Sequence, residues 1–243
     1  MEHVPPDVFG EDYLYFYESW LDDELSNAQA ELIWRTLGLA ERAEVLDVPC
    51  GHGRIANRLA ARGARVTALD ADAFFLERAQ AEAAELGVEV AYVQADMKEL
   101  PWEGRFDAVV NWFTSFGYFD DEGNRVWLEA ALRTLKPGGR LAIDVHSRDV
   151  FMRNRVPASV VERDGDLLVD RHRFDVEMGR EESEPWVVRD GQVRKTEYSV
   201  RFYTFTELRS LLLDAGFAAV EAIGHDGEPL TLESRRMIVI ATR

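Results

Sequence analysis

The sequence of 243 residues contains a single cysteine, Cys50. One thiol excludes an internal disulfide and a cysteine-based metal site, and it is typical of a protein from a reducing compartment. Long hydrophobic runs are also absent, since no segment approaches the ~18 uninterrupted apolar residues of a membrane span. The first residues lack the basic start and apolar run of a secretion signal. We therefore expect a cytoplasmic protein with no membrane partner.

Basic side chains are few relative to acidic ones. Lys and Arg together number 28 against 45 Asp and Glu, which gives a formal net charge of −17. Binding of a phosphate backbone requires clustered basic side chains, so nucleic acid is not an expected partner, and anionic lipid offers no general attraction. The apolar content of 47% is that of a folded globular protein rather than a disordered chain.

From residue 44 onward, short apolar runs alternate with longer amphipathic runs. This pattern is typical of strands and helices in βα units around a parallel sheet. Gly63 and Gly87 follow two of the amphipathic runs, where helices commonly end. We expect strands at 44–48, 65–70, 89–94, 105–112 and 139–146, and helices at 54–62, 73–86 and 122–135. The sequence thus predicts a Rossmann-like α/β fold.

Other segments flank this sheet. Residues 11–38 read as two helices, and the first of them carries Tyr13, Phe16, Tyr17 and Trp20 on one face. Residues 147–204 contain two hairpin-turn signals, at 163–166 and 189–192, and predict an antiparallel insertion. We expect three parts: an N-terminal helical cap at 1–39, an α/β domain at 40–146 and 205–243, and the insertion at 147–204. The last part closes with a helix at 206–214 and strands at 217–223 and 236–242.

A glycine-rich loop follows the first predicted strand. Gly51 and Gly53 stand between that strand and the next helix, and glycines let backbone N–H groups approach a ligand closely. Open α/β sheets place their ligand sites at this carboxyl edge. Taken alone, the loop also satisfies a dinucleotide-binding fingerprint, and a tight turn that serves only helix–strand packing is the less favoured alternative.

Two acidic residues end the next two predicted strands. Asp70 is placed to accept hydrogen bonds from both hydroxyls of a ribose, because an ionised carboxylate is a pure acceptor. Asp96 is placed to accept from an adenine amino group, and the neighbouring Met97 offers an apolar cover for the ring. Each acid alone also fits a turn or a helix N-cap. In this order, together with the glycine loop, they predict an adenosine site.

With these motifs in place, the sequence resembles the class I S-adenosylmethionine-dependent methyltransferases. The resemblance spans residues 40–146 and 205–243, and Pro49 departs from it by standing where the family usually has glycine. The matching segments are 46–53, 69–70, 95–97, 106–110, 135–141 and the helix with two strands from Thr206.

The resemblance implies a seven-stranded sheet with its last strand antiparallel. It also implies S-adenosylmethionine as cofactor, S-adenosylhomocysteine as product, and no metal. Asp47 and Gly51 would lie along the methionine part and Asn111 to Phe113 beneath the cofactor, near the reacting methyl. The implied cofactor-binding residues are Asp47, Gly51, Gly53, Asp70, Ala71, Asp96, Met97, Asn111, Trp112 and Phe113.

The methyl acceptor implied by the resemblance is a small molecule that reacts through nitrogen or oxygen. The aromatic loop near Phe116 and the tyrosines Tyr13 and Tyr17 resemble those of sugar amine and natural-product methyltransferases, in which N-terminal tyrosines contact cofactor and substrate. His146, at the end of the fifth strand, is a candidate general base. The aromatic stripe also fits an ordinary core, and His146 also fits a structural role.

Two other functions remain open from the sequence. The same glycine loop suits an NAD-dependent oxidoreductase, and a regulator that binds S-adenosylmethionine without catalysis retains every cofactor motif. The insertion at 147–204 is expected to act as a substrate lid or as a subunit contact in a homo-oligomer.

Overall fold

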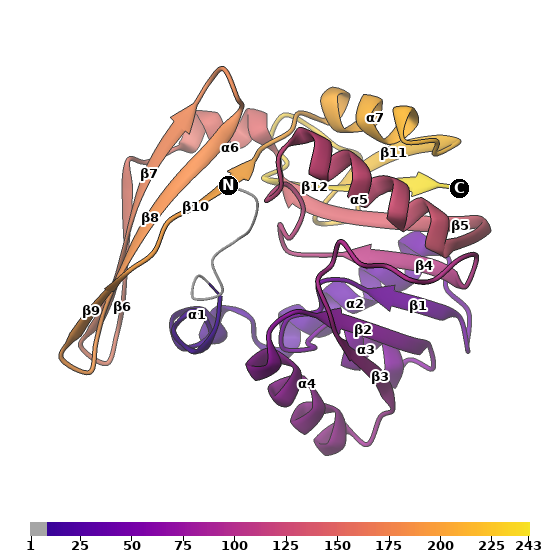
Figure 1. Cartoon of the computed structure of the whole chain (residues 1–243), viewed down its shortest axis with the longest axis horizontal. Helices are drawn as coiled ribbons and strands as arrows, with labels where there is room; N and C mark the ends of the chain where they lie inside the picture. The colour runs from indigo at the N-terminus through magenta and orange to yellow at the C-terminus, as the bar shows by residue number, and fades with distance from the viewer. Residues whose placement is uncertain (1–8) are drawn as a thin grey trace.

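The structure is a computed structural model, and it describes residues 9–243 of the chain. The first eight residues of the predicted N-terminal cap lie outside the described residues. Two β-sheets are present, one with helices on both faces and one antiparallel (Figure 1).

Seven strands form the main sheet, in the order β11-β12-β5-β4-β1-β2-β3. Strand β12 runs antiparallel to both β5 and β11, whereas the other neighbouring strands are parallel. The expected sheet with an antiparallel last strand is therefore confirmed. The strands are β1 (Glu44–Asp47), β2 (Arg65–Asp70), β3 (Val90–Gln94), β4 (Phe106–Asn111), β5 (Leu135–His146), β11 (Ala219–Gly224) and β12 (Arg236–Thr242).

Helices cover both faces of this sheet, which buries its central strands completely. Ala108, Val109 and Val110 of β4 are fully buried, as expected for a parallel strand covered on both sides. One face packs on α2 (Asp23–Leu37), α3 (Ala56–Ala61) and α4 (Ala73–Leu86), and the other on α5 (Asp121–Thr134) and α7 (Phe205–Asp214). Side-chain caps begin four of these helices, α2, α4, α5 and α7, as Asp72 does for α4.

Some elements differ from the sequence prediction. Strand β5 begins at Leu135, directly after α5, although the sequence predicts a strand only from residue 139. The glycines there lie in an irregular pairing with β4 that shifts register between Phe106 and Ala108, so the chain bends without leaving the sheet. A short helix, α6 (Arg148–Asn154), precedes the second sheet and was not expected.

The segment predicted as an antiparallel insertion forms the second sheet, in the order β10-β8-β7-β6, with β9 paired to β8. Both expected hairpins are present. Asp164 and Gly165 have φ of 53° and 89°, and Asp190 and Gly191 have 55° and 71°, the positive values that two-residue hairpin turns require. The strands are β6 (Ala158–Arg163), β7 (Asp166–Asp175), β8 (Arg180–Arg189), β9 (Gln192–Lys195) and β10 (Tyr198–Arg201).

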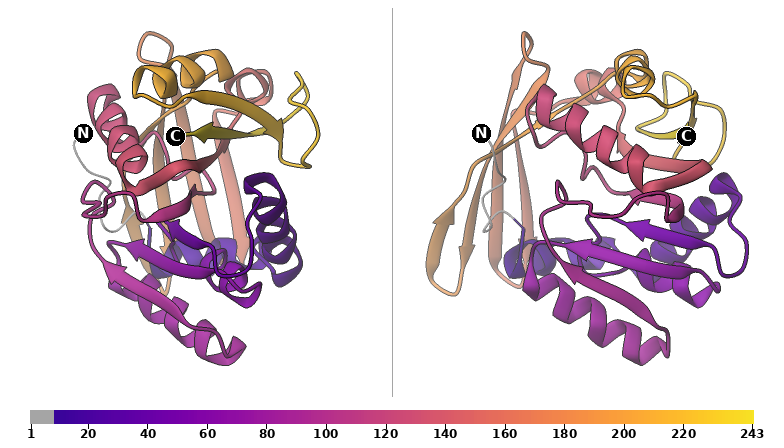
Figure 2. Two further views of the ribbon diagram at one scale, coloured as in Figure 1. Left: turned by 90° about the vertical axis from the view of Figure 1, so that its right-hand side faces the viewer. Right: turned by 45° about the vertical axis from the view of Figure 1, so that its right-hand side comes forward.

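Helix α1 (Glu11–Tyr17), followed by a short 3₁₀ turn (Glu18–Trp20), lies between the two sheets (Figures 1 and 2). Arg189 of β8 binds Asp12 at 2.9 Å, and its guanidinium stacks 4.1 Å from the ring centre of Tyr15. The N-terminal helix is thereby fixed to the antiparallel sheet and faces the carboxyl edge of the main sheet.

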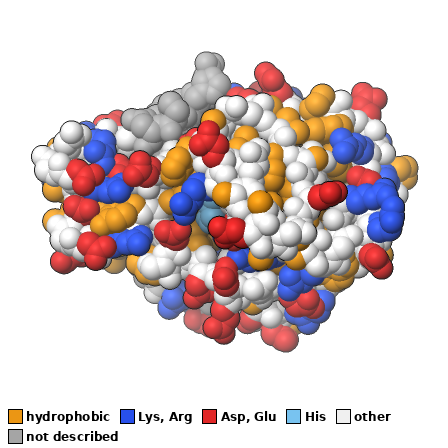
Figure 3. Space-filling view, turned by 90° about the horizontal axis from the view of Figure 1, so that it is seen from below, with side chains coloured by type: hydrophobic (Ala, Val, Ile, Leu, Met, Phe, Trp, Pro, Cys, Tyr) orange, Lys and Arg blue, Asp and Glu red, His pale blue; other side chains and the backbone are white. Residues whose placement is uncertain are grey.

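The outer face of the antiparallel sheet bears exposed apolar side chains. Val188 and Val193 are cross-strand partners, and Val160 belongs to the same face by register. Charges of both signs are intermixed over this end of the molecule, at the left of Figure 3. A subunit contact through this face stays a prediction. Within residues 9–243, no helix combines the length and apolar character that crossing a bilayer demands.

Candidate active site

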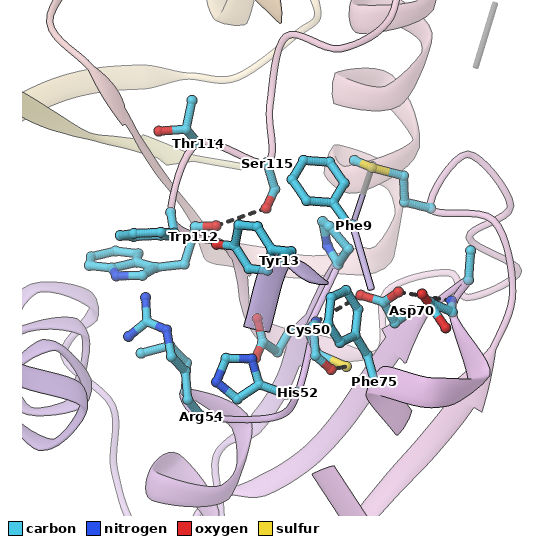
Figure 4. Close-up of a pocket in the computed structure, with 18 of the residues that line it drawn as sticks. Phe9, Tyr13, Cys50, His52, Arg54, Asp70, Phe75, Trp112, Thr114 and Ser115 are labelled. Atoms are coloured by element: carbon cyan, nitrogen blue, oxygen red, sulfur yellow. Dashed lines mark hydrogen bonds between the residues drawn. The ribbon is translucent and has the colours of Figure 1, made fainter. Parts of the chain in front are cut away.

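A cavity of about 530 Å³ opens at the carboxyl ends of β1, β2, β3 and β4 (Figure 4). Parallel strands bring the residues that follow them to one edge, so positions far apart in sequence meet there. In Figure 4, Asp70 and Phe75 lie toward one end, Trp112 and Arg54 toward the other, and Tyr13 between them. The cavity walls include Asp47, Gly51, Asp70, Ala71, Asp96, Met97, Trp112, Phe113 and Tyr13 among the residues expected from the sequence.

The glycine loop and the end of β2 are held together by a carboxylate. Asp70 accepts the N–H of Gly51 at 2.7 Å through one oxygen and the N–H of Asp72 at 3.0 Å through the other. Gly51 has a positive φ of 54°, and a Cβ added there would meet no atom within 4 Å. Burial raises the pKa of Asp70, although these two backbone bonds lower it. Its carboxylate is thus oriented on the cavity wall by the loop itself.

Asp47, the last residue of β1, is the most isolated acid of the cavity. It is 1% exposed, and its Oδ2 atom has no hydrogen-bond partner among the described residues. Burial raises its pKa to about 7, with Arg54 acting in the opposite direction and Asp70 reinforcing the rise. A buried acceptor without a partner is costly unless a ligand completes it.

The third strand brings Asp96 and Met97 to the same cavity. Asp96 accepts the N–H of Lys98 at 2.9 Å through Oδ1. The side chains of Phe75 and Phe119 add apolar wall. This end of the cavity therefore combines a carboxylate acceptor with flat apolar surfaces, which suits a polar aromatic ring.

The wall after β4 is braced by a charged pair. Asp144 binds Arg236 at 2.7 Å and accepts the N–H of Phe113 at 3.1 Å. The guanidinium groups of Arg54 and Arg236 lie 5.0 and 5.1 Å from the ring centre of Phe113. Phe113 and Thr114 have φ of 62° and 63°, and non-glycine residues hold such backbone angles only where their surroundings enforce them.

Phenol rings close the remaining side. Tyr13 lines the cavity, and its ring packs edge-to-face on the ring of Phe9, with the ring centres 5.4 Å apart. The ring of Phe9 in turn packs on the ring of Tyr118, with the ring centres 5.6 Å apart. Burial raises the pKa of Tyr13 to about 12 and holds the pKa of Tyr118 well above its usual value, so both phenols stay protonated.

Five of the expected site residues are not brought to this cavity. Phe116 is 1% exposed and packs against Trp127 and Tyr203 in the core. His146 stacks on Phe202 with ring centres 5.6 Å apart, and burial lowers its pKa to about 4. The positions of Phe116 and His146 in the structure indicate that both side chains serve packing.

Gly53 and Asn111 support the glycine loop without lining the cavity, and Tyr17 lines a different cavity. A Cβ at Gly53 would come within 2.6 Å of the Cβ of Ala79, so this glycine permits close packing of the loop on α4. Asn111 is fully buried and donates to the carbonyl of Val48 at 2.9 Å. Tyr17 lines a neighbouring cavity.

Sequence reasoning missed other residues of the wall, among them Phe9, His52, Arg54 and Phe75. His52 and Arg54 adjoin the glycine loop in the sequence and Phe75 follows shortly after Asp70, whereas Phe9 has no such signal. Burial, together with the charge of Arg54, lowers the pKa of His52 to about 4, so its imidazole is neutral at physiological pH.

Comparison with known proteins places this geometry in context. Residues 45–139 match a family model described as a methyltransferase domain. The chain is 30% identical over 206 residues to the cypemycin N-terminal methyltransferase of Streptomyces sp, covering 82% of each protein. It is 34% identical over 128 residues to the ubiquinone biosynthesis O-methyltransferase of Alkalilimnicola ehrlichii, covering 52% of this chain and 51% of that protein.

The chain spans about half the length of several of its curated relatives. Among solved structures, an S-adenosylmethionine-dependent methyltransferase from Clostridium acetobutylicum superposes with a TM-score of 0.76 at 17% identity, covering 95% of both chains. The similarity in fold therefore covers nearly the whole length of both chains.

Proposed function

The chain belongs to the class I S-adenosylmethionine-dependent methyltransferases, and from that premise we propose that it methylates a nitrogen atom of a small-molecule amine. One observation carries most weight. Asp47, Asp70 and Asp96 line a single cavity whose remaining side is built from the aromatic residues of α1 and of the loop after β4.

The described residues fit S-adenosylmethionine. The unpartnered Oδ2 of Asp47 suits the ammonium of its methionine part. Asp70 offers its carboxylate to the ribose hydroxyls, and Asp96 with Met97 suits the adenine. When bound, the cofactor supplies an activated methyl group on a sulfonium.

The protein itself contributes alignment and exclusion of water. Tyr13, Phe113 and Tyr118 line the cavity and offer aromatic faces, which attract cations. Holding two reactants in line contributes ~7–11 kcal/mol to a displacement, without a covalent nucleophile. Catalysis by positioning is therefore sufficient for this reaction.

Nitrogen is favoured over oxygen because, apart from the acids assigned to the cofactor, the described walls of the cavity offer only a weak base, His52, whose pKa is lowered to about 4. Tyr13 and Tyr118 stay protonated, and His146, the base expected from the sequence, stacks on Phe202 outside the cavity. A hydroxyl acceptor needs its proton removed, whereas a neutral amine already has a free electron pair. Burial also lowers the pKa of an amine and so favours its neutral, reactive form.

The curated relatives also favour nitrogen as the methyl acceptor. The cypemycin enzyme, whose name states an N-terminal acceptor, matches over 82% of the chain. The ubiquinone O-methyltransferase matches over 52%. A match that covers more of the chain includes more of the acceptor side and carries more information about the acceptor.

Methyl transfer from S-adenosylmethionine with a trideuterated methyl group tests this proposal. We expect mass spectrometry to detect labelled products from primary and secondary amines and none from the corresponding alcohols and phenols. Labelling of hydroxyl acceptors alone would contradict the assignment of nitrogen. Binding of S-adenosylhomocysteine without any transfer, across a broad panel, would support the regulator instead.

A further inference from the structure

A second cavity of about 490 Å³ lies between α1 and the antiparallel sheet. It adjoins the cavity described above, because Phe9, Tyr13 and Asp72 line both. The rings of Tyr13 and Tyr17 are stacked with their centres 4.9 Å apart; Tyr13 lies in the wall of both cavities and Tyr17 in the wall of the second. A molecule that reaches from one cavity into the other therefore passes along aromatic side chains.

Asp170 of β7 is the unusual residue of this second cavity. Its side chain is 8% exposed, and its Oδ1 atom has no hydrogen-bond partner among the described residues. In the register of β7, Leu168 and Asp170 face inward on alternate positions, so the carboxylate occupies a place that would ordinarily be apolar. Leaving a buried carboxylate without a cation is unfavourable.

The neighbouring charged groups do not neutralise Asp170. His172 has its Nδ1 atom 3.9 Å from Asp170 Oδ1, but burial and the charge of Arg155 lower the pKa of this histidine and keep it uncharged. Arg155 itself binds Glu181 at 3.3 Å. The pKa of Asp170 is raised to about 7, mainly by burial and also by the charge of Glu181, although hydrogen bonds from the backbone of Glu184 and from Tyr198 lower it.

The arginines of the cavity wall are already engaged. Arg189 pairs with Asp12 at 2.9 Å, and Arg194 pairs with the same carboxylate at 2.7 Å. Asp72 and Asp190 also line the cavity. Five carboxylates and two arginines line the described part of this cavity, so its net charge is negative, and the group that complements it is a cation.

We propose that the second cavity is an acceptor subsite in which Asp170 binds a cationic group of the substrate, distinct from the nitrogen that is methylated. This inference rests on the proposed function, because the reacting nitrogen is assigned to the first cavity. The acceptor class that fits is a compact molecule with two amino groups, the second of which lies against Tyr17 and Asp170. Asp170 is then a specificity-determining residue rather than a catalytic one.

Two probes of matched shape test the subsite. Para-xylylenediamine and para-methylbenzylamine share one ring and one aminomethyl group, and only the diamine carries a second ammonium. With wild-type protein saturated by S-adenosylhomocysteine, we expect the diamine to bind about tenfold more tightly, as calorimetry measures, because a hydrogen-bonded ion pair of this kind is worth about that much. Equal affinities, or no binding of the diamine, would overturn the proposal without any variant.

Asp170→Asn identifies the residue responsible. The preference for the diamine should fall to about twofold or less, while the affinity for S-adenosylhomocysteine is unchanged. Asp190→Asn is the matched control, since Asp190 lines the same cavity but its side chain is 78% exposed, and it should keep the preference. A preference that survives in Asp170→Asn overturns the role of Asp170. Failure of S-adenosylhomocysteine to bind wild-type protein would instead contradict the proposed function.

Discussion

Replacement of Asp70 by alanine is expected to weaken binding of S-adenosylhomocysteine by about two orders of magnitude. Asp70 is 8% exposed, and it lines the cofactor cavity. It is already oriented by the N–H groups of Gly51 and Asp72. Two ribose hydroxyls that lose a charged acceptor lose about 3 kcal/mol between them. Isothermal titration calorimetry measures the loss directly.

A second cause must be separated from this one, because Asp70 also holds the glycine loop through Gly51. An analogue of S-adenosylhomocysteine that lacks both ribose hydroxyls separates them. Wild-type protein should bind this analogue about a hundredfold more weakly, whereas the alanine variant should bind both ligands almost equally. If the variant weakens both ligands by the same factor, Asp70 acts only by holding the loop.

Asp47→Asn is expected to have opposite effects on stability and on binding. The pKa of Asp47 in the folded protein, about 7, lies above its usual value of 3.8, so the folded protein holds this proton more tightly than the unfolded chain. The stability that the proton contributes is complete below the usual pKa and is lost as the pH rises to about 7. Asparagine has no such proton to lose. The free energy of unfolding of the variant should therefore not show this loss, which amounts to up to about 4 kcal/mol in wild-type protein.

Urea denaturation near pH 5 and near pH 8, without ligand, measures this effect. The free energy of unfolding should fall less between the two pH values in the variant than in wild-type protein. Near pH 8 the variant should also bind S-adenosylhomocysteine at least about tenfold more weakly, since the ammonium loses its ionised partner. Equal pH dependence in the two proteins would show that Asp47 is not the group that titrates.

The main sheet follows from the sequence because its signals are local. Strand β2 and helix α4 begin and end where apolar periodicity, Asp72 and Gly87 place them. Both hairpins of the second sheet follow from their Asp-Gly turns. Helix α6 is only seven residues long and its N-cap Ser147 makes no side-chain capping hydrogen bond, and the irregular start of β5 depends on its partner β4.

The cofactor side of the site is predictable for a related reason. Residues that follow parallel strands meet at one edge whatever the rest of the chain does, so Asp47, Asp70 and Asp96 are found together. Phe116 and Tyr118 stand two residues apart in one loop, and only its path decides that Tyr118 lines the cavity while Phe116 enters the core.

Asp170 has no sequence signal at all. It is one polar residue in an alternating strand, and its significance depends on which face of the sheet is covered by α1. Long-range packing of this kind is not encoded in local periodicity. The acceptor side is therefore the part of the site for which the three-dimensional structure is indispensable.

Calorimetric titration of wild-type protein with S-adenosylhomocysteine, and separately with NAD, tests most directly whether the strand ends form a site for this cofactor. We expect S-adenosylhomocysteine to bind at one site per chain with micromolar or tighter affinity, and NAD to give no binding heat. Binding of NAD together with no response to S-adenosylhomocysteine would contradict the assignment of this cavity.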